Sequence, residues 1–182
     1  MLNNDVSEID GIRISKVKSV TDTRGTFIKF HPLIELENSL NSVAISFNPN
    51  VGTIRGLHFQ VAPFAEEKLL TCVQGSIFDV AVDLRLSSKT FGKWASIELS
   101  ATNALQVYLP IGVAHGFQTL MPDSIIHYSL TSTYTPQSSY TINPFGDLGI
   151  DWPVKQYSIS DRDRDGISLS SAVQKYAESL KS

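Results

Sequence analysis

The stretch Pro110-Ile111-Gly112-Val113-Ala114-His115 places a proline–glycine turn directly before a segment with β-strand character. Proline fixes one backbone angle and glycine accepts conformations that are closed to other residues, so this combination favours a tight reversal of the chain. A strand that starts at such a turn carries His115 inward, close to one end of the sheet. We therefore expect a strand–turn–strand unit that presents an imidazole to the interior of the fold.

Short strand-like segments lie on both sides of this turn, and turn residues separate them. Helices do not alternate with these segments, so the pattern predicts an all-β fold, an antiparallel sandwich or barrel rather than a parallel α/β sheet. Helical spacing occurs in residues 32–40 and again in residues 169–180. Strands are predicted at residues 12–17, 42–47, 68–73, 76–84, 94–99, 106–109, 115–120 and 124–131, and residues 55–60 are also strand-like.

The Pro-x-Gly-x-x-His spacing resembles the second motif of the cupin superfamily, whose members are jelly-roll barrels. In the usual first cupin motif, a His-x-His pair and a carboxylate bind a metal together with the histidine of the second motif. This chain instead has His58-Phe59-Gln60 at that place. A transition-metal site normally needs three or four protein ligands, and the two motifs supply only His58 and His115. We therefore predict a cupin-type jelly-roll barrel without a metal.

The composition is that of an ordinary globular protein. The 182 residues are 42% hydrophobic and 18% charged, which fits one domain over residues 1–182 with a helical tail at residues 167–182. A net charge of −3, without a basic cluster, argues against a nucleic-acid partner. The N-terminus does not resemble a signal peptide and no apolar run reaches membrane-spanning length, so we expect a cytoplasmic protein. Cys72 is the only cysteine and is expected to pack as a small apolar residue.

Three ionisable residues stand among apolar neighbours on the strand-like segments: Arg55, His58 and Lys68. Such groups are costly to bury unless they are paired or used. A lone imidazole is usually a core histidine, but two nearby cations would hold it neutral, as a general base must be near pH 7. We favour His58 as a base. Lys68 either pairs at the surface with Glu66 or Glu67, or points inward to stabilise an enolate oxygen.

Other polar residues leave two interpretations open. Strand alternation puts Asp79, Asp83 and Arg85 on one face, which is either part of a barrel mouth or a structural ion-pair network. Tyr128, in an apolar run, is either a core aromatic or a proton donor near an ammonium. Asp163 lies in a charge-rich run, where a solvated loop is the usual outcome.

A series of short motifs, in order along all of the chain except its final helix, matches one family. These motifs are Asp22-Thr23-Arg24-Gly25, Asn48, residues 52–60, Lys68, residues 78–85, 88–94, 99–103 and 110–117, Tyr128, residues 134–136, 150–153 and 159–163. On these residues the chain resembles the dTDP-4-dehydrorhamnose 3,5-epimerase family of cupin-fold epimerases that act on sugar nucleotides.

The resemblance assigns roles to individual residues. It implies that His58 removes the acidic α-hydrogens of the sugar and that Asp163 pairs with His58. It also implies that Lys68 lies near the C4 oxygen, that Tyr128 donates a proton, and that no cofactor is needed. The substrate-binding residues that we predict with it are Arg24, Arg55 and His115 at the diphosphate and sugar, Tyr134 near the nucleotide, and Phe27, Lys29, Asn48, Gln60 and Arg162.

The implied function is inversion of C3, C5 or both in a nucleotide-diphosphate 4-keto-6-deoxysugar, in deoxysugar biosynthesis of the rhamnose kind. We expect a homodimer without nucleic-acid or membrane partners. The nucleobase stays open, because Lys29 stands where the family commonly has a glutamate, and Gln137, Ser138 and Ser139 stand where it often has acidic residues. The alternatives are a mono-epimerase, an epimerase for another nucleotide sugar, or a non-catalytic cupin that only binds one.

Overall fold

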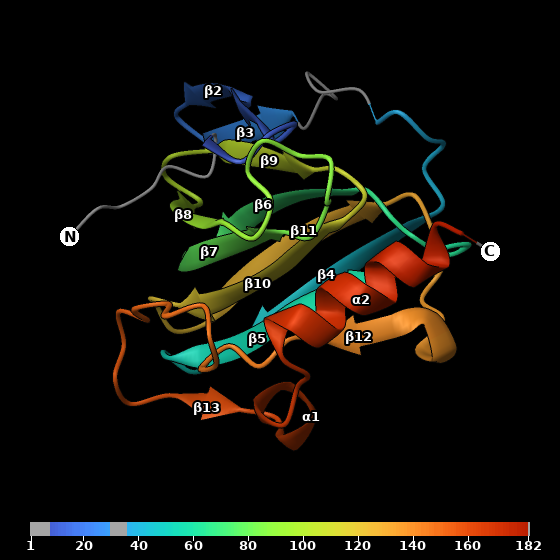
Figure 1. Cartoon of the computed structure of the whole chain (residues 1–182). Helices are drawn as coiled ribbons and strands as arrows, with labels where there is room; N and C mark the ends of the chain where they lie inside the picture. The colour runs from blue at the N-terminus through green and yellow to red at the C-terminus, as the bar shows by residue number, and fades with distance from the viewer. Residues whose placement is uncertain (1–7, 30–35, 182) are drawn as a thin grey trace.

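Two β-sheets face each other in the computed structural model, which describes residues 8–29 and 36–181 (Figure 1). Pairing within them is antiparallel, except that β13 runs parallel to β5. The five-stranded sheet has the order β1 (Arg13–Lys16), β9 (Leu105–Leu109), β6 (Lys68–Gln74), β11 (Ser124–Leu130) and β4 (Ser42–Asn48). The six-stranded sheet has the order β12 (Ser139–Thr141), β5 (Thr53–Gln60), β10 (Val113–Thr119), β7 (Ser76–Asp83) and β8 (Trp94–Ser100), with β13 (Ser158–Ile159) beside β5.

Both faces of the six-stranded sheet are covered by apolar contacts. Ala81 of β7 belongs to the core between the sheets, whereas its neighbours Val80 and Val82 belong to a second cluster on the outer face. The helix α2 (Leu169–Ser179) covers that outer face (Figure 1), with Ala172 and Tyr176 buried one turn apart. The alternation along β7 therefore turns Asp79, which has the same parity as Ala81, toward the space between the sheets.

The sequence-based prediction of an all-β fold with a C-terminal helix is confirmed. The turn before His115 forms as expected, with the Val113 N–H donating to the Pro110 carbonyl at 3.2 Å. Gly112 has a φ of +83°, a conformation that other residues rarely adopt. Within the described part of the chain, no helix is long and apolar enough to cross a membrane.

The helix predicted at residues 32–40 does not form where the structure describes it. Residues 30–35 lie outside the described residues, and residues 36–40 have no helical turn. Instead, the backbone N–H groups of Glu37 and Asn38 donate to the carboxylate of Glu67. A contact with the distant β6 segment thus replaces the local hydrogen bonds of a helix.

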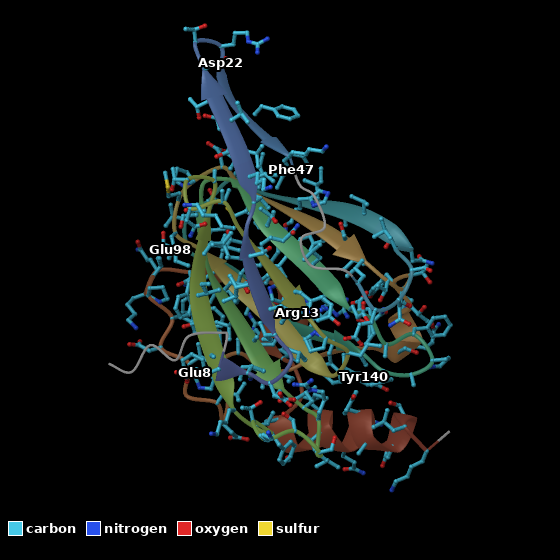
Figure 2. All side chains as sticks on the ribbon, turned by 90° about the horizontal axis from the view of Figure 1, so that it is seen from above. Glu8, Arg13, Asp22, Phe47, Glu98 and Tyr140 are labelled. Carbon is cyan, nitrogen blue, oxygen red and sulfur yellow. The ribbon has the colours of Figure 1, made fainter. Side chains whose placement is uncertain are left out.

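An additional hairpin projects from the two sheets. It consists of β2 (Lys18–Asp22) and β3 (Gly25–Lys29), and Figure 2 shows it extending away from the body of the protein with Asp22 at its tip. Val20 and Phe27 are 66% and 69% exposed on it. The hairpin was not predicted, and neither were the short strands β12 and β13.

Candidate active site

A pocket of about 290 Å³ opens between the two sheets. Strands β5 and β10 line one side of it, and β4, β6 and β11 line the other. Two later segments, one with Tyr134 and Ser139 and the other with Arg162, form its rim. The predicted site residues that line this pocket are Arg55, His58, Gln60, Lys68, His115, Tyr128, Tyr134 and Arg162.

His58 and His115 are direct neighbours on the paired strands β5 and β10. The two backbones approach closely beside them, because Gly56 and Gly116 face each other. A Cβ atom on Gly56 would lie only 2.5 Å from the Gly116 Cα, and Gly56 has a φ of +125°. A larger residue would push apart the strands that carry the two imidazoles.

Asp163 fills a break along the outer edge of β5. That edge pairs with β13 up to Ile54 and with β12 from His58 onward. Leu57 exchanges backbone hydrogen bonds with Ile142, so the break falls at Gly56. Asp163, in the short helix α1 (Asp161–Arg164), accepts the Gly56 N–H at 3.1 Å and the His58 Nε2–H at 2.7 Å. Because Nε2 donates to Asp163, Nδ1 of His58 is left to accept a proton.

The surroundings hold His58 neutral and Asp163 charged. Burial is the largest effect on the pKa of His58 and lowers it below the ordinary 6.5. The Asp163 carboxylate raises that pKa, and Lys68 and His115 lower it. The ring still keeps 38% of its surface accessible toward the pocket. Burial alone would raise the pKa of Asp163, but the bonds from His58 and Gly56 outweigh it and keep that pKa below its ordinary value. The effect of Lys68 predicted from sequence has the right sign, although burial is the larger cause.

Lys68 and Tyr128 reach the pocket from the facing sheet. Lys68 is buried, and its Nζ donates to the His58 carbonyl at 3.1 Å, so it points inward. The Tyr128 ring meets His115 edge-on, with ring centroids 6.2 Å apart. Its hydroxyl forms no hydrogen bond with the described residues, and burial together with the charge of Asp79 raises its pKa. Tyr128 therefore carries its proton at neutral pH.

The two aspartates of β7 have different surroundings. Asp79 accepts His115 Nε2–H at 2.6 Å beneath the pocket, and its other oxygen has no partner among the described residues. Asp83 accepts bonds from Arg85, Ser88 and Thr90, and neither Asp83 nor its partners line the pocket. This position favours the structural ion-pair network, of the two interpretations that the sequence left open, for Asp83 and Arg85. Asp79 differs, because it binds the pocket residue His115.

Three predicted binding residues sit around the rim or behind it. Arg162 lies at the rim and donates to the Tyr134 hydroxyl at 2.9 Å. Asn48 lies behind Arg55 and does not itself line the pocket. Its Oδ1 accepts a hydrogen bond from the Arg55 Nε–H at 2.8 Å. Gln60 lines the pocket, but three backbone bonds to the loops around Phe64 and Tyr134 occupy its amide.

The structure does not bring Arg24, Phe27 and Lys29 to the pocket. All three belong to the projecting hairpin, and Arg24 pairs with Asp22 at 2.6 Å near its tip. A single chain therefore leaves this predicted part of the binding site separate from the rest.

Some pocket residues were not singled out as site residues from the sequence. Phe117 and Glu66 line the pocket two residues away from His115 and Lys68, respectively, so strand alternation was the available signal. Over residues 8–29 and 36–181, no three His, Cys, Asp or Glu side chains come together as metal ligands would. Cys72 is buried in the core, where burial raises the pKa of its thiol to about 11.

Comparisons with known proteins agree on one family. The model of the dTDP-4-dehydrorhamnose 3,5-epimerase family matches residues 6–171. A dTDP-4-dehydrorhamnose 3,5-epimerase from Sinorhizobium fredii is 45% identical over 127 residues, which span 68% of this chain and 65% of that relative.

Solved structures extend the match over nearly the whole chain. The dTDP-6-deoxy-D-glucose-3,5-epimerase of Legionella pneumophila, in complex with dTDP-4-keto-L-rhamnose, superimposes with a TM-score of 0.84 at 34% identity. The match covers 92% of this chain and 93% of that one. A 3′-monoepimerase from Streptomyces bikiniensis, in complex with dTDP-quinovose, gives 0.83 at 29% identity and covers 98% of this chain and 90% of that one.

Proposed function

Because the chain belongs to the dTDP-4-dehydrorhamnose 3,5-epimerase family, we propose that it is an isomerase that inverts C3, C5 or both of a nucleotide-linked 4-keto-6-deoxy sugar, in deoxysugar biosynthesis. The observation that carries this proposal is the His58–Asp163 pair at 2.7 Å, which shares one pocket with Lys68 and Tyr128. A protein that only binds a sugar nucleotide has no need of a base and a separate proton donor.

The reaction follows from the acidity of the hydrogens beside the C4 ketone. Nδ1 of His58 takes the proton from C3 or C5, and the electron pair of the broken C–H bond moves onto the C4 oxygen as an enolate. The Lys68 ammonium stabilises that oxygen. Tyr128, or a water, then protonates the carbon from the opposite face, which restores the ketone with an inverted centre, and solvent resets both proton carriers. The base and the oxyanion site contribute on the order of 10²–10⁴-fold and 10²–10³-fold.

The rest of the pocket supplies anchors for an anionic nucleotide. Arg55, Arg162 and His115 line it together, which suits a diphosphate. Tyr134 lies under the Arg162 guanidinium at the rim, 5.8 Å from ring centroid to Cζ, and offers an aromatic face near the nucleotide. The cytoplasmic location remains a prediction.

A homodimer would complete the binding site. The hairpin residues Arg24, Phe27 and Lys29 contact substrate in this proposal from the neighbouring chain, because they do not reach the pocket of their own. The edge strand β4 supports pairing, since among the described residues it has a strand partner on one side only, and its own Val43, Ile45 and Phe47 are exposed. Sedimentation is expected to give twice the 20.0 kDa chain mass at micromolar concentration. A 20.0 kDa species would contradict the dimer.

Deuterium exchange tests the proposed function itself. The protein is incubated in D₂O with a panel of nucleotide 4-keto-6-deoxy sugars, and NMR and mass spectrometry locate the deuterium. We expect exchange at C3, C5 or both, together with an inverted product. Exchange at one carbon only would identify a mono-epimerase. Tight binding of these sugars without any exchange would instead support the non-catalytic alternative.

A further inference from the structure

Glu66 is the one acidic residue among the described residues that line the pocket. Its side chain is 10% exposed, its Oε1 lies 3.5 Å from Lys68 Nζ, and it forms no hydrogen bond with the described residues. A carboxylate in this place repels both a diphosphate and a developing enolate. Its presence therefore needs a reason beyond the proposed reaction.

The adjacent Glu67 shows what a structural carboxylate looks like in this segment. Glu67 points to the other side of the strand, where Oε2 accepts the N–H groups of Glu37 and Asn38 and Oε1 accepts Asn38 Nδ2 at 2.7 Å. Both of its oxygens are occupied. The carboxylate of Glu66 faces the pocket instead, and its oxygens are still able to accept hydrogen bonds there.

The position beside Lys68 limits what Glu66 can contact, given the proposed function, on which this inference rests. Lys68 lies at the C4 oxygen of the sugar in that reaction. Oxygens on adjacent ring carbons are about as far apart as hydrogen-bonded atoms, and of the two carbons next to C4 only C3 bears a hydroxyl, since C5 bears the methyl group. We infer that Glu66 determines sugar specificity by accepting a hydrogen bond from the C3 hydroxyl.

This contact has a consequence for substrate choice. A hydrogen bond to a charged group contributes a factor of about 10 to 100 in transition-state binding. The wild-type protein should therefore favour a 4-keto-6-deoxy sugar with a C3 hydroxyl over its 3-deoxy analogue by that factor. The carboxylate also orients the ring while His58 acts on either neighbouring carbon.

The test compares two substrates through a reaction that both can undergo. Deuterium exchange at C5 is measured as kcat/KM for a nucleotide 4-keto-6-deoxy sugar and for its 3-deoxy analogue. In Glu66→Ala the parent sugar should lose about 10- to 100-fold while the analogue changes little, so that the preference falls to near one. Glu66→Gln keeps a neutral acceptor and should retain part of the preference.

Glu67→Gln is the matched control, because it changes the same residue type one position away. It should lower thermal stability and leave the preference between the two sugars unchanged. Equal losses for both sugars in Glu66→Ala and Glu66→Gln would overturn the inference, since Glu66 would then act only by holding Lys68. Absence of exchange with either sugar in the wild type would instead contradict the proposed function.

Discussion

Asp83 and Asp163 are both buried carboxylates, but they lie in opposite kinds of surroundings. Asp83 is enclosed by Arg85, Ser88 and Thr90, which fill its acceptor positions. Asp163 binds an imidazole that stays open to the pocket, in which the hydroxyl of Tyr128 has no partner among the described residues. Polar groups whose hydrogen-bonding positions are all occupied hold a fold in one arrangement, whereas polar groups with open positions are available to a substrate. We therefore expect the Asp83 cluster to affect stability and the Asp163 cluster to affect chemistry.

Replacement of Lys68 should affect the chemistry most strongly among the residues that support His58. In Lys68→Met, exchange at C3 and at C5 should fall together by about 10²–10³-fold, because both routes pass through the same enolate oxygen. Lys155→Met removes an exposed ammonium and should leave exchange unchanged. Loss at only one carbon would show that Lys68 does not act on the shared oxygen.

Replacement of Asp163 should lower activity less and change its pH dependence. In Asp163→Asn, kcat/KM should fall by about 10–100-fold, because the imidazole loses its orienting charge. Asp163 raises the pKa of His58, so its loss should move the acid limb of the kcat/KM profile to lower pH. Asp161→Asn, on the same helix, should leave the profile in place. A shift of the acid limb to higher pH would contradict the assignment.

Tyr128 should affect the two carbons unequally if it protonates C5. Tyr128→Phe should still permit proton loss, because His58 and Lys68 remain, but the C5-inverted product should fall by about tenfold or more. The C3-inverted product should fall less if water protonates that carbon. Tyr140→Phe is the control, since Tyr140 packs behind the pocket residue Phe59 and does not itself line the pocket. NMR of the product mixture measures the ratio, and an unchanged ratio would make Tyr128 a core aromatic only.

Asp83 should have the smallest effect on activity and a clear effect on stability. Asp83→Asn should cost about 3 kcal/mol in free energy of unfolding, because it leaves the Arg85 guanidinium without its charge partner. The hydrogen bonds from Arg85, Ser88 and Thr90 keep the folded pKa of Asp83 below 3.8 against the effect of burial. Its contribution to stability is therefore present above pH 3.8 and is lost as the pH falls through the folded pKa.

Denaturant unfolding at neutral pH and again at acidic pH measures the contribution of Asp83 to the free energy of unfolding. Asp151→Asn breaks an exposed ion pair and should cost less than about 1 kcal/mol. A loss of exchange by folded Asp83→Asn protein would remove the distinction between the two clusters.

The fold and the site residues on the strands were predictable, because local sequence patterns encode them. The turn before His115 and the alternation along β7 determine which side chains point inward, and the family resemblance assigned roles to His58, Lys68 and Tyr128. Asp163 was identified as the partner of His58 through the resemblance alone, because its local sequence predicts only a solvated loop. It lies in a charge-rich run, and its contact with His58 joins positions 105 residues apart.

Other features depend on contacts that no local pattern contains. The helix predicted at residues 32–40 was wrong over its described part, because Glu67 binds the backbone there. The hairpin β2–β3 was missed because its residues are mostly exposed and show no alternating burial. The separation of Arg24, Phe27 and Lys29 from the pocket of their own chain follows from that hairpin.

The central claim is that neutral His58 removes the hydrogens next to the C4 ketone. It is tested most directly by deuterium exchange at C3 and C5 in His58→Asn, with nucleotide affinity measured on the same preparation. We predict that exchange falls by about 10²–10⁴-fold at both carbons, while nucleotide affinity changes little because Arg55 and Arg162 remain. Retention of more than about a tenth of wild-type exchange would contradict the assignment of His58 as the base.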